Sequence, residues 1–368
     1  MHSLLFVIDQ LAPGGAQRQM VSLALGLLAN GHHIELFNYY PEQRFFRHDL
    51  EQVGITIHDC PKGKKGFSTN VLLTLKRLLK TGRFDAALSF LDTPSTYLLL
   101  AGLGEKTKLI VSDRSSYLRF NEYVCALKRQ LFHLADAVVA NSSTQRDWLI
   151  NGAKLPTRKM HIILNGYNFY DFQSRPNFPD SVRDIKLIAI GRINPVKNIE
   201  NLIAALDIFH AKYGRCPTLT WVGRSDTPAY EKKILNLLNQ HPQVNNIWSW
   251  AGERHDIPQL LAEHHALILP SLFEGLPNVV CEAMMAGKPV LASNVCDNSV
   301  LIKENERGFL FDPNNPHCIV RAIEKLTNLN NEDWKLISIK TRRYAILNLS
   351  LQKMVTAYEN LFNSLVID

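Results

Sequence analysis

Short apolar runs alternate with amphipathic, helix-like patterns along this chain of 368 residues. Such alternation is typical of βα units, in which parallel strands form a sheet and helices cover both of its faces. In the first half we expect strands at residues 4–8, 33–38, 55–58, 86–89, 109–112, 137–140 and 161–164, with helices between them. The sequence therefore restricts the fold to the doubly wound α/β class.

The alternation stops in a polar segment and begins again at residues 185–190. Pro176 and Pro179 mark the polar segment as a linker. The expected organisation is a first domain over residues 1–170, a linker over 171–184 and a second domain over 185–350. The halves share no sequence repeat, and two sheets joined by one linker predict a cleft between two domains.

Residues 266–293 contain the most informative unit of the chain. The apolar run 266–269 predicts a buried strand, 270–277 is a loop, and Asn278 is expected to cap a short helix that Gly287 ends. The next strand is expected to begin at once. Because the loop and the helix N-terminus then lie at the carboxyl edge of a parallel sheet, we expect an anionic ligand there.

Two carboxylates lie in this unit, Glu274 on the loop and Glu282 one turn into the helix. Gly275 and Pro277 interrupt regular backbone between them, so both side chains can face one crevice. Carboxylates accept hydrogen bonds from vicinal hydroxyls, which suits a ligand that carries sugar rings beside phosphates. The alternative is a pair of solvated surface glutamates.

A second candidate site follows the first strand of the second domain. Gly191 and Arg192 leave that strand, and Lys197 precedes a helix expected over 199–210. An arginine forks onto phosphate oxygens, a lysine acts as a point charge, and the helix dipole adds to both. Because two cations near a helix N-terminus oppose its dipole unless an anion is present, the pattern predicts a phosphate clamp.

Gly14 and Gly15 follow the first strand of the chain and open an amphipathic helix. Paired glycines there allow a ligand or another backbone to approach the helix N-terminus closely. A plain tight turn is the alternative. The G-x-G-x-x-G fingerprint is missing from this place, which argues against a nicotinamide enzyme.

The formal net charge of +7 indicates an anionic partner such as a nucleotide, a nucleic acid or a membrane surface. Residues 61–84 hold seven basic residues and no acidic one, and from Thr69 their pattern is that of an amphipathic helix. This basic helix could lie on anionic lipid, or its lysines could simply face water. The basic residues are not interleaved with aromatic ones, which argues against nucleic acid.

The six cysteines are scattered, with no CxxC pair, so the sequence indicates neither a zinc site nor a disulfide framework. The apolar start, residues 3–8, lacks a basic leader and a cleavage site, and we expect a strand rather than a signal peptide. No apolar run approaches the roughly 18 residues of a membrane span. We expect a reduced, cytoplasmic setting, with any membrane contact peripheral.

Residues 270–290 resemble the donor-binding signature of the retaining glycosyltransferases of family 4, whose Glu-x7-Glu pair falls on Glu274 and Glu282. The resemblance implies the GT-B fold, in which two Rossmann-like domains face a cleft. It implies an acceptor-binding first domain, a nucleotide-sugar-binding second domain, and a last helix, 351–368, that packs back on the first domain. Gly14 and Gly15 would face the cleft near the diphosphate.

The same resemblance implies a role for each candidate residue of the second domain. Arg192 and Lys197 would neutralise the departing diphosphate, Glu274 would orient the donor sugar and Glu282 would hold the ribose hydroxyls. The binding site would further include Arg254 against the nucleobase, with Gly275, Leu276 and Asn278. No Asp-x-Asp triplet occurs, so we expect no metal and no cofactor. The donor substrate would be a UDP-, GDP- or ADP-sugar, and we favour a UDP-sugar.

Many members of the family have a histidine of the first domain that touches the donor sugar. This chain has no histidine between His58 and His133, which puts that contact in doubt. Asp113 and Arg114 end the fifth expected strand. Arg114 could meet an acceptor phosphate, and Asp113 could bind a hydroxyl or pair with Arg114.

The sequence predicts a retaining glycosyltransferase that moves a sugar to a hydroxyl of a lipid-linked or envelope polysaccharide acceptor. By family analogy the setting is bacterial lipopolysaccharide O-antigen, capsule or exopolysaccharide synthesis at the cytoplasmic face of the inner membrane. A nucleotide-sugar hydrolase or phosphorylase of the same fold and a nucleic-acid-binding protein are the alternatives.

Overall fold

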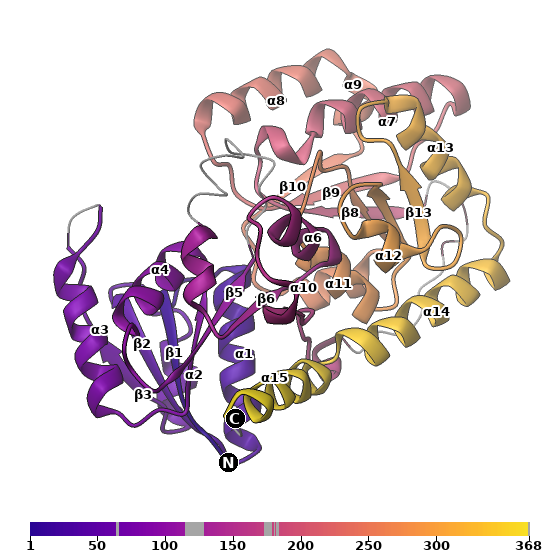
Figure 1. The fold of residues 1–368 in the computed structure, drawn as a ribbon. Helices are drawn as coiled ribbons and strands as arrows, with labels where there is room; N and C mark the ends of the chain where they lie inside the picture. The colour runs from indigo at the N-terminus through magenta and orange to yellow at the C-terminus, as the bar shows by residue number, and fades with distance from the viewer. Residues whose placement is uncertain (64–65, 115–128, 173–178, 180, 182–183, 367–368) are drawn as a thin grey trace. The chain divides into compact units, whose positions relative to one another are not determined.

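The computed structural model describes the whole chain except residues 64–65, 115–128, 173–178, 180, 182–183 and 367–368. The chain forms two compact units (Figure 1). Unit 1 comprises residues 1–166 and 350–368, and unit 2 comprises residues 167–349. Much of the expected linker lies outside the described residues, and the short 3-10 helix before it, η3 (Phe169–Phe172), belongs to unit 2.

Unit 1 is built on a seven-stranded parallel sheet in the order β3-β2-β1-β4-β5-β6-β7. Its strands are β1 (Ser3–Gln10), β2 (His33–Tyr40), β3 (Thr56–Asp59), β4 (Ala86–Phe90), β5 (Lys108–Asp113), β6 (Ala137–Ala140) and β7 (Met160–Ile162). All seven strands expected from the sequence are present, and their ends differ from prediction by at most two residues. The order is that of a dinucleotide-binding Rossmann sheet.

Helices cover both faces of this sheet. They are α1 (Gly15–Ala29), α2 (Arg47–Gln52), α3 (Thr69–Thr81), α4 (Asp92–Ala101), η1 (Gln130–Leu134), α6 (Ser143–Asn151), η2 (Thr157–Lys159) and α15 (Leu351–Val366). Successive residues of β1 enter two different cores: Phe6 packs with α1 and α15, and Leu5 with α3 and α4. The last helix therefore completes unit 1, where Val355 contacts Gly26 of α1 so closely that an added Cβ would lie 2.5 Å from it.

Unit 2 repeats the architecture with a six-stranded parallel sheet in the order β10-β9-β8-β11-β12-β13. Its strands are β8 (Lys186–Ile190), β9 (Thr218–Val222), β10 (Trp248–Gly252), β11 (Ala266–Leu269), β12 (Val290–Ser293) and β13 (Gly308–Phe311). Its helices are η5 (Pro195–Lys197), α7 (Ile199–Tyr213), α8 (Pro228–Gln240), α9 (Pro242–Asn245), α10 (Ile257–Glu263), α11 (Asn278–Met285), α12 (Asn298–Ile302), α13 (Pro316–Thr327) and α14 (Asn331–Leu349).

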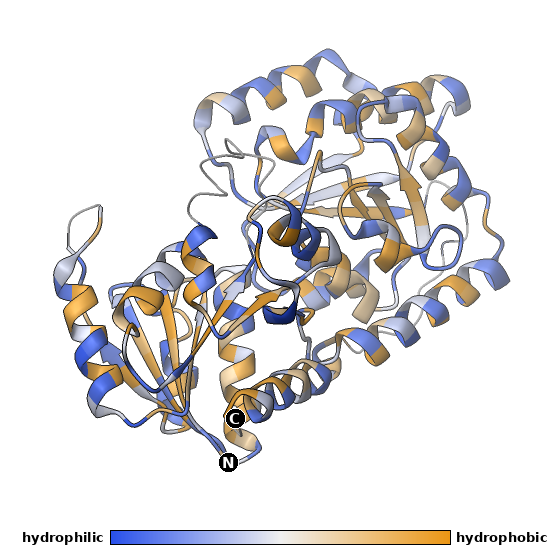
Figure 2. Ribbon diagram, in the orientation of Figure 1, coloured by the Kyte–Doolittle hydropathy of each residue, from blue (hydrophilic) through white to orange (hydrophobic). Residues whose placement is uncertain are grey.

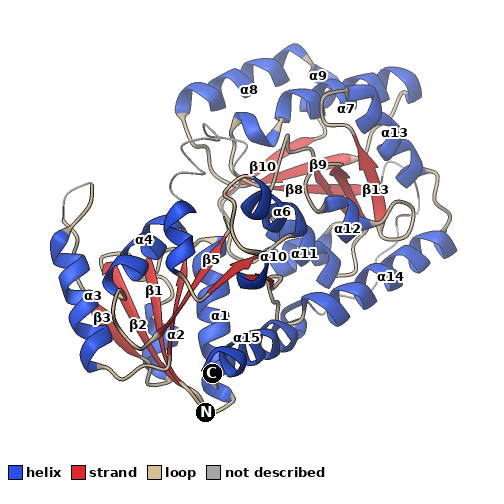
Figure 3. Cartoon of the chain, in the orientation of Figure 1, coloured by secondary structure: helices blue, strands red, loops and turns tan. Residues whose placement is uncertain are grey.

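The hydropathy of the elements explains why the sequence predicted them so closely. Figure 2 shows apolar colour along the strands of unit 1, while the helices around them carry apolar and polar stripes. In Figure 3 the strands of each unit lie between helices, so buried strands read as apolar runs and half-buried helices as periodic patterns. Within the described residues, every helix is too short or too polar to span a bilayer.

In both units the strand order changes direction beside the first strand, between β1 and β4 in unit 1 and between β8 and β11 in unit 2. The loops that leave the carboxyl ends of such a strand pair turn to opposite faces of the sheet, which opens a crevice. In unit 2 the two loops are residues 191–198 and 270–277. Both candidate motifs of the second domain therefore lie at one topological switch point.

Candidate functional site

Lys197 and Glu274 meet across the switch point of unit 2. Lys197 ends η5 after β8, and Glu274 lies on the loop after β11. The Nζ of Lys197 lies 2.5 Å from Oε1 of Glu274, and the two side chains are 17% and 15% exposed. Two residues that the sequence assigned to separate motifs are thus hydrogen-bonded to each other, at the edge where a parallel sheet binds ligands.

Two further contacts fasten these loops together. The backbone N–H of Leu272 donates to the carbonyl of Val196 at 2.8 Å. The side-chain amide of Asn198 donates to the carbonyls of Pro270 at 3.1 Å and Pro313 at 2.8 Å. Asn198 has φ 54°, a left-handed conformation that asparagine tolerates better than most residues. The sequence reasoning missed this residue, although an asparagine between a short turn and a helix is a usable signal.

Gly191 leaves room for the lysine. A Cβ added at Gly191 would lie 2.8 Å from Cε of Lys197, which is closer than carbon atoms can approach without movement. The carbonyl of Gly191 also accepts a hydrogen bond of 2.9 Å from Nε1 of the buried Trp221. The glycine that ends β8 therefore positions the Lys197 side chain along the strand end.

Arg192 pairs with Asp226 rather than with a residue of the central loop. Its guanidinium NH1 donates to Oδ1 of Asp226 at 3.0 Å, and the Arg192 side chain is 57% exposed. Asn194 donates to the other oxygen of Asp226 at 2.8 Å. Asp226 was not predicted, because an acid on the loop after β9 has no sequence signal that links it to Arg192.

Each cation of the predicted phosphate clamp therefore has an acidic partner within unit 2. Lys197 and Arg192 precede α7, whose N-terminal dipole is unfavourable for positive charge. Glu274 and Asp226 compensate that charge in the structure. A bound diphosphate would offer both cations a stronger anion, and the exposure of Arg192 leaves it accessible to one.

Asn278 was predicted to cap helix α11, and this prediction is wrong, because the helix already begins at Asn278. Pro277 occupies the N-cap position, no side chain caps the helix, and Asn278 is its first residue. The Asn278 side chain instead accepts a 2.7 Å hydrogen bond from the hydroxyl of Tyr167. The predicted end is confirmed, because Gly287 follows the last turn with φ 69°.

Glu282 lies inside α11 and is 5% exposed. Leu276, on the loop before the helix, is 6% exposed, and Gly275 next to it is partly buried. Burial raises the pKa of the adjacent Cys281 thiol to about 12, and the negative charge of Glu282 contributes to that rise. The solvated-surface alternative for Glu282 is therefore wrong, while its predicted ribose contact stays a prediction.

Arg254 forms a local pair at the start of α10. Its Nε and NH2 atoms donate to the carboxylate of Asp256 at 2.8 and 2.5 Å. The Arg254 side chain is 44% exposed, so a contact with a nucleobase would compete with an ion pair that water already screens. The neighbouring Trp248 stacks on the buried Trp221, as expected for a core residue.

In unit 1, Gly14 and Gly15 stand at the start of α1. Gly14 is its N-cap and Gly15 its first residue. An added Cβ at Gly14 would lie 2.3 Å from Oε1 of Gln17, whose amide donates to Asp9 at 3.2 Å. Burial raises the pKa of Asp9 at the end of β1 above its usual value. The glycine pair thus admits a polar contact at the switch point of unit 1, and its predicted part in ligand binding stays a prediction.

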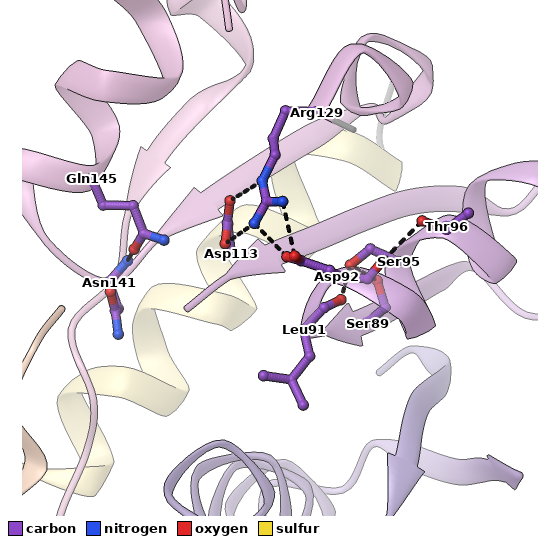
Figure 4. Close-up of polar contacts among 9 residues, drawn as sticks. All are labelled: Ser89, Leu91, Asp92, Ser95, Thr96, Asp113, Arg129, Asn141 and Gln145. Atoms are coloured by element: carbon purple, nitrogen blue, oxygen red, sulfur yellow. Dashed lines mark hydrogen bonds and ion pairs between the residues drawn. The ribbon is translucent and has the colours of Figure 1, made fainter. Parts of the chain in front are cut away.

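Of the two alternatives for Asp113, pairing with Arg114 is wrong, and contact with a hydroxyl stays a prediction. Asp113 accepts a hydrogen bond of 3.1 Å from Nε of Arg129, and the guanidinium of Arg129 also reaches both carboxylate oxygens of Asp92 (Figure 4). Burial opposes the charge of Arg129, but the two carboxylates outweigh it and hold the pKa of the guanidinium above its usual value. Ser115 and Ser116, which follow Arg114, lie outside the described residues.

Arg114 turns instead toward β4 and the last helix. Its guanidinium lies 3.7 Å above the centre of the Phe90 ring and donates to Asn165 at 2.5 Å and to the hydroxyl of Tyr358 at 3.4 Å. An arginine held in this way fastens α15 to the sheet. A contact with an acceptor phosphate would have to compete with those bonds.

The basic segment forms α3 with its apolar face inside unit 1. Val71, Leu75 and Leu79 are buried in the core, and Lys76, Arg77 and Lys80 are exposed on the outer face. Lys62 is not part of that face, because its ammonium lies 5.5 to 5.8 Å from the ring centres of Tyr39, Tyr40 and Tyr97. Lys64 and Lys65 lie outside the described residues.

Known protein families match both halves of the chain. Residues 172–343 match the model described as "Glycosyl transferases group 1", and residues 13–169 match the model described as "Glycosyltransferase Family 4". Together the two models extend over most of both units, without β1 and α15.

Two relatives of this chain are named for the reactions that they catalyse. The "GalNAc-alpha-(1->4)-GalNAc-alpha-(1->3)-diNAcBac-PP-undecaprenol alpha-1,4-N-acetyl-D-galactosaminyltransferase" of Campylobacter jejuni is 23% identical over 350 residues, which is 93% of this chain and 94% of that protein. The "UDP-Gal:alpha-D-GlcNAc-diphosphoundecaprenol alpha-1,3-galactosyltransferase" of Escherichia coli is 29% identical over 117 residues, 32% of this chain and 30% of that protein.

Solved structures share the fold. Anabaena Alr3699/HepE, in complex with UDP and glucose, superposes with a TM-score of 0.81 at 19% identity and covers 99% of this chain and 100% of its own. A glycosyltransferase from Rickettsia africae superposes with a TM-score of 0.84 at 20% identity, over 99% and 98% of the two chains. These likenesses confirm the predicted GT-B class of two Rossmann-like domains.

Proposed function

This chain belongs to glycosyltransferase family 4, and from that premise we propose that it moves a sugar, with retention of anomeric configuration, from a nucleotide-sugar to a hydroxyl of a lipid-linked glycan. The enzyme class follows from the family: it is a glycosyltransferase. The observation that carries the proposal is the contact of Lys197 with Glu274 at the switch point of unit 2. A cation for a diphosphate and an acid for a sugar hydroxyl meet there in one place.

Lys197 and Arg192 neutralise the departing nucleoside diphosphate. As the glycosidic bond breaks, negative charge grows on the diphosphate oxygens, so cations aimed at it stabilise the transition state more than the ground state. Binding of the diphosphate draws Lys197 away from Glu274. The released carboxylate of Glu274 then accepts hydrogen bonds from the donor sugar, while Glu282 accepts those of the ribose.

Retention follows from attack on the face that the diphosphate leaves. In this mechanism a donor phosphate oxygen accepts the proton of the attacking hydroxyl, and no side chain forms a covalent intermediate. Arg192 and Lys197 keep the leaving group in place while it accepts that proton. We expect a UDP-sugar as donor, which agrees with the UDP in the HepE structures and the UDP-Gal in the name of the E. coli relative.

The acceptor is proposed to be a glycan on a polyprenyl diphosphate, held by unit 1 at the cytoplasmic face of a bacterial inner membrane. Both curated relatives are named for acceptors that carry diphospho-undecaprenol. Lys76, Arg77 and Lys80 supply a basic surface for anionic lipid. Because the apolar face of α3 is used in the core, this membrane contact is electrostatic and weakens with salt.

Transfer is tested with radiolabelled UDP-, GDP- and ADP-sugars and short polyprenyl-diphosphate-linked glycans as acceptors. We expect label to enter the lipid-linked product from one donor, and NMR of the product to show the anomeric configuration of the donor. Release of free sugar at the same rate with and without acceptor would instead establish the hydrolase alternative. Phosphorolysis of the donor without an acceptor would establish the phosphorylase alternative.

Membrane binding is tested by sedimentation with vesicles that contain phosphatidylglycerol. Replacement of Lys76, Arg77 and Lys80 by serine is expected to leave the protein in the supernatant. The matched control replaces Arg215, Lys232 and Lys340, which are exposed in unit 2, and removes the same charge. Equal sedimentation of both variants would remove α3 from the proposal.

A further inference from the structure

Unit 1 contains a hollow of about 460 Å³ beside the start of α4. Its wall includes Lys62, Phe67, Asp92, Thr93, Tyr97 and Arg129. The volume lies within the range of about 300–1,000 Å³ that small-molecule sites occupy. None of these residues belongs to the donor site proposed in unit 2.

Among the described residues around the hollow, positive and negative charges balance. Lys62 and Arg129 carry one positive charge each, and Asp92 together with Asp113 behind it carries two negative ones. An anionic ligand would meet Asp92, and a cationic ligand would meet Lys62, so an ion of either sign gains little here. A hydroxyl group suits both residues, because it can donate to the carboxylate and accept from the ammonium.

One side of the hollow is aromatic. The ring of Phe67 stacks on the ring of Tyr97, with centroids 4.9 Å apart and planes inclined by 20°. Phe67 is 57% exposed, so a face or edge of its ring is open to a ligand, and Tyr97 is fully buried beneath it. An apolar platform opposite polar groups fits a ring that has C–H bonds on its face and hydroxyls at its edge.

The polar groups are held in fixed positions. Asp92 is locked by the guanidinium of Arg129, which is itself 2% exposed and bound to Asp113 (Figure 4). The residue before Asp92, Leu91, has φ 74° and ψ 162°, a conformation that few residues other than glycine adopt. Lys62 is held over three tyrosine rings. A site that is ordered before the ligand arrives loses less entropy on binding.

We propose that this hollow binds one uncharged pyranose residue of the acceptor glycan, a neutral hexose or an N-acetylhexosamine. The ring packs on Phe67 while its hydroxyls bond to Asp92, Thr93 and Lys62. The assignment of this sugar to the acceptor rests on the proposed function. Because the positive and negative charges of the described residues balance, uronic acids and phosphorylated sugars are expected to bind more weakly at this position.

Binding is tested with the full chain, without donor, by saturation-transfer NMR at millimolar methyl glycosides. The probes are methyl α-D-galactopyranoside, methyl N-acetyl-α-D-galactosaminide and, as an anionic match, methyl α-D-galactopyranosiduronate. We expect at least one neutral glycoside to bind and the uronate to bind more weakly. Equal binding of the uronate, or no neutral binding, would overturn the proposal.

Two variants locate the binding. Phe67→Ala is expected to weaken it by roughly 2- to 12-fold, the range for loss of one aromatic contact, and Thr93→Val by a smaller factor. Leu73→Ala removes an equally exposed apolar side chain of α3, outside the hollow, and is expected to change nothing. Unchanged binding in both Phe67→Ala and Thr93→Val would overturn the assignment.

The transfer assay separates this site from the proposed function. Transfer with an increased acceptor KM and an unchanged donor KM in Phe67→Ala supports both. Transfer with an unchanged acceptor KM in Phe67→Ala would remove the site and keep the function. Neutral glycoside binding that Phe67→Ala weakens, in a chain that transfers no sugar, would keep the site and remove the function.

Discussion

The carboxyl edges of the two sheets both collect charged residues, but they bury them to different degrees. In unit 1, Arg129 is 2% exposed and the Asp113 side chain fully buried. In unit 2, Lys197 is 17% exposed and Arg192 57%. The strand orders correspond, so the difference arises from the loops and not from the sheet.

This difference separates charges that hold structure from charges that can change partner. Removing one member of a buried ion pair leaves an uncompensated charge in the interior, at a cost of about 3–5 kcal/mol. An exposed pair contributes only about 0–1 kcal/mol and can be exchanged for a ligand. Arg129 therefore shapes unit 1, whereas the exposed Arg192 is available to a diphosphate and Lys197 lies between these two cases.

Arg129→Met should produce the largest loss of stability. It removes the guanidinium contacts of the buried Asp113 and of Asp92, so we expect the free energy of unfolding of unit 1 to fall by about 3–5 kcal/mol in denaturant titrations. Arg146→Met is the control, since Arg146 pairs with Asp147 on the surface, and should cost no more than about 1 kcal/mol. Similar losses in both variants would show that the burial of an ion pair does not determine the stability lost when its arginine is removed.

Lys197→Ala should have the largest effect on turnover. Loss of one charge-stabilising group from a transition state typically lowers kcat by about 100- to 1,000-fold. Stability should also fall, because Glu274, 15% exposed, loses the Lys197 ammonium, but by less than in Arg129→Met, whose carboxylate partner Asp113 is fully buried. Lys212→Ala, which removes an exposed lysine paired with Glu324 in the same unit, is the control and should retain full turnover. A loss of less than about threefold in Lys197→Ala would count heavily against the phosphate clamp.

The two edges also differ in how far the sequence predicted them. All strands of unit 1 were expected, because a buried parallel strand is a short apolar run. The pair of Lys197 and Glu274 was reached from two motifs, each beside a strand end, whose meeting follows from parallel topology. Asp226 could not be reached, since it lies on a third loop.

Arg129 shows why the ion-pair cluster of unit 1 could not be predicted from the sequence. Its partners begin α4 and end β5, so three separate elements must be placed before the cluster exists. Sequence spacing offered Asp113 its neighbour Arg114, but the strand directs adjacent side chains to opposite faces. A fully buried aspartate needs a cation from somewhere, and only the fold identifies which one.

Gly191→Ala should move the Lys197 side chain without removing its charge. The added methyl would meet Cε of Lys197 at 2.8 Å, and the flexible end of that side chain can shift. We expect turnover to fall by roughly tenfold, less than in Lys197→Ala. In the Lys197→Ala background the same substitution should have almost no effect, because effects of groups in contact are not additive. If Gly191→Ala lowers turnover by tenfold in the Lys197→Ala background as well, Gly191 acts on a group other than Lys197.

Acid pH should produce the smallest of these effects, a loss of stability in unit 2. His265 directly precedes β11 in unit 2. Its burial, together with the positive charges of Lys288, Lys186 and His264, lowers its pKa to about 4. Its Nδ1 accepts a hydrogen bond from the backbone N–H of Lys186 at 2.9 Å, which protonation would break. In unit 1, His32, which precedes β2, lies 3.1 Å from the carboxylate of Glu359.

The sign follows from the lowered pKa. Above pH 6.5 His265 is neutral folded and unfolded, and between pH 6.5 and 4 only the unfolded chain takes up the proton, so stability falls as pH falls through that window. His265→Asn retains an acceptor for the Lys186 N–H and cannot be protonated. We expect it to raise the Tm of unit 2 at about pH 5.8, relative to its value at pH 7.5, by about 2–4 °C, the shift that roughly 1 kcal/mol produces. His317→Asn, at an exposed position of unit 2, should give no such gain, and an equal gain in both variants would remove His265 as the cause.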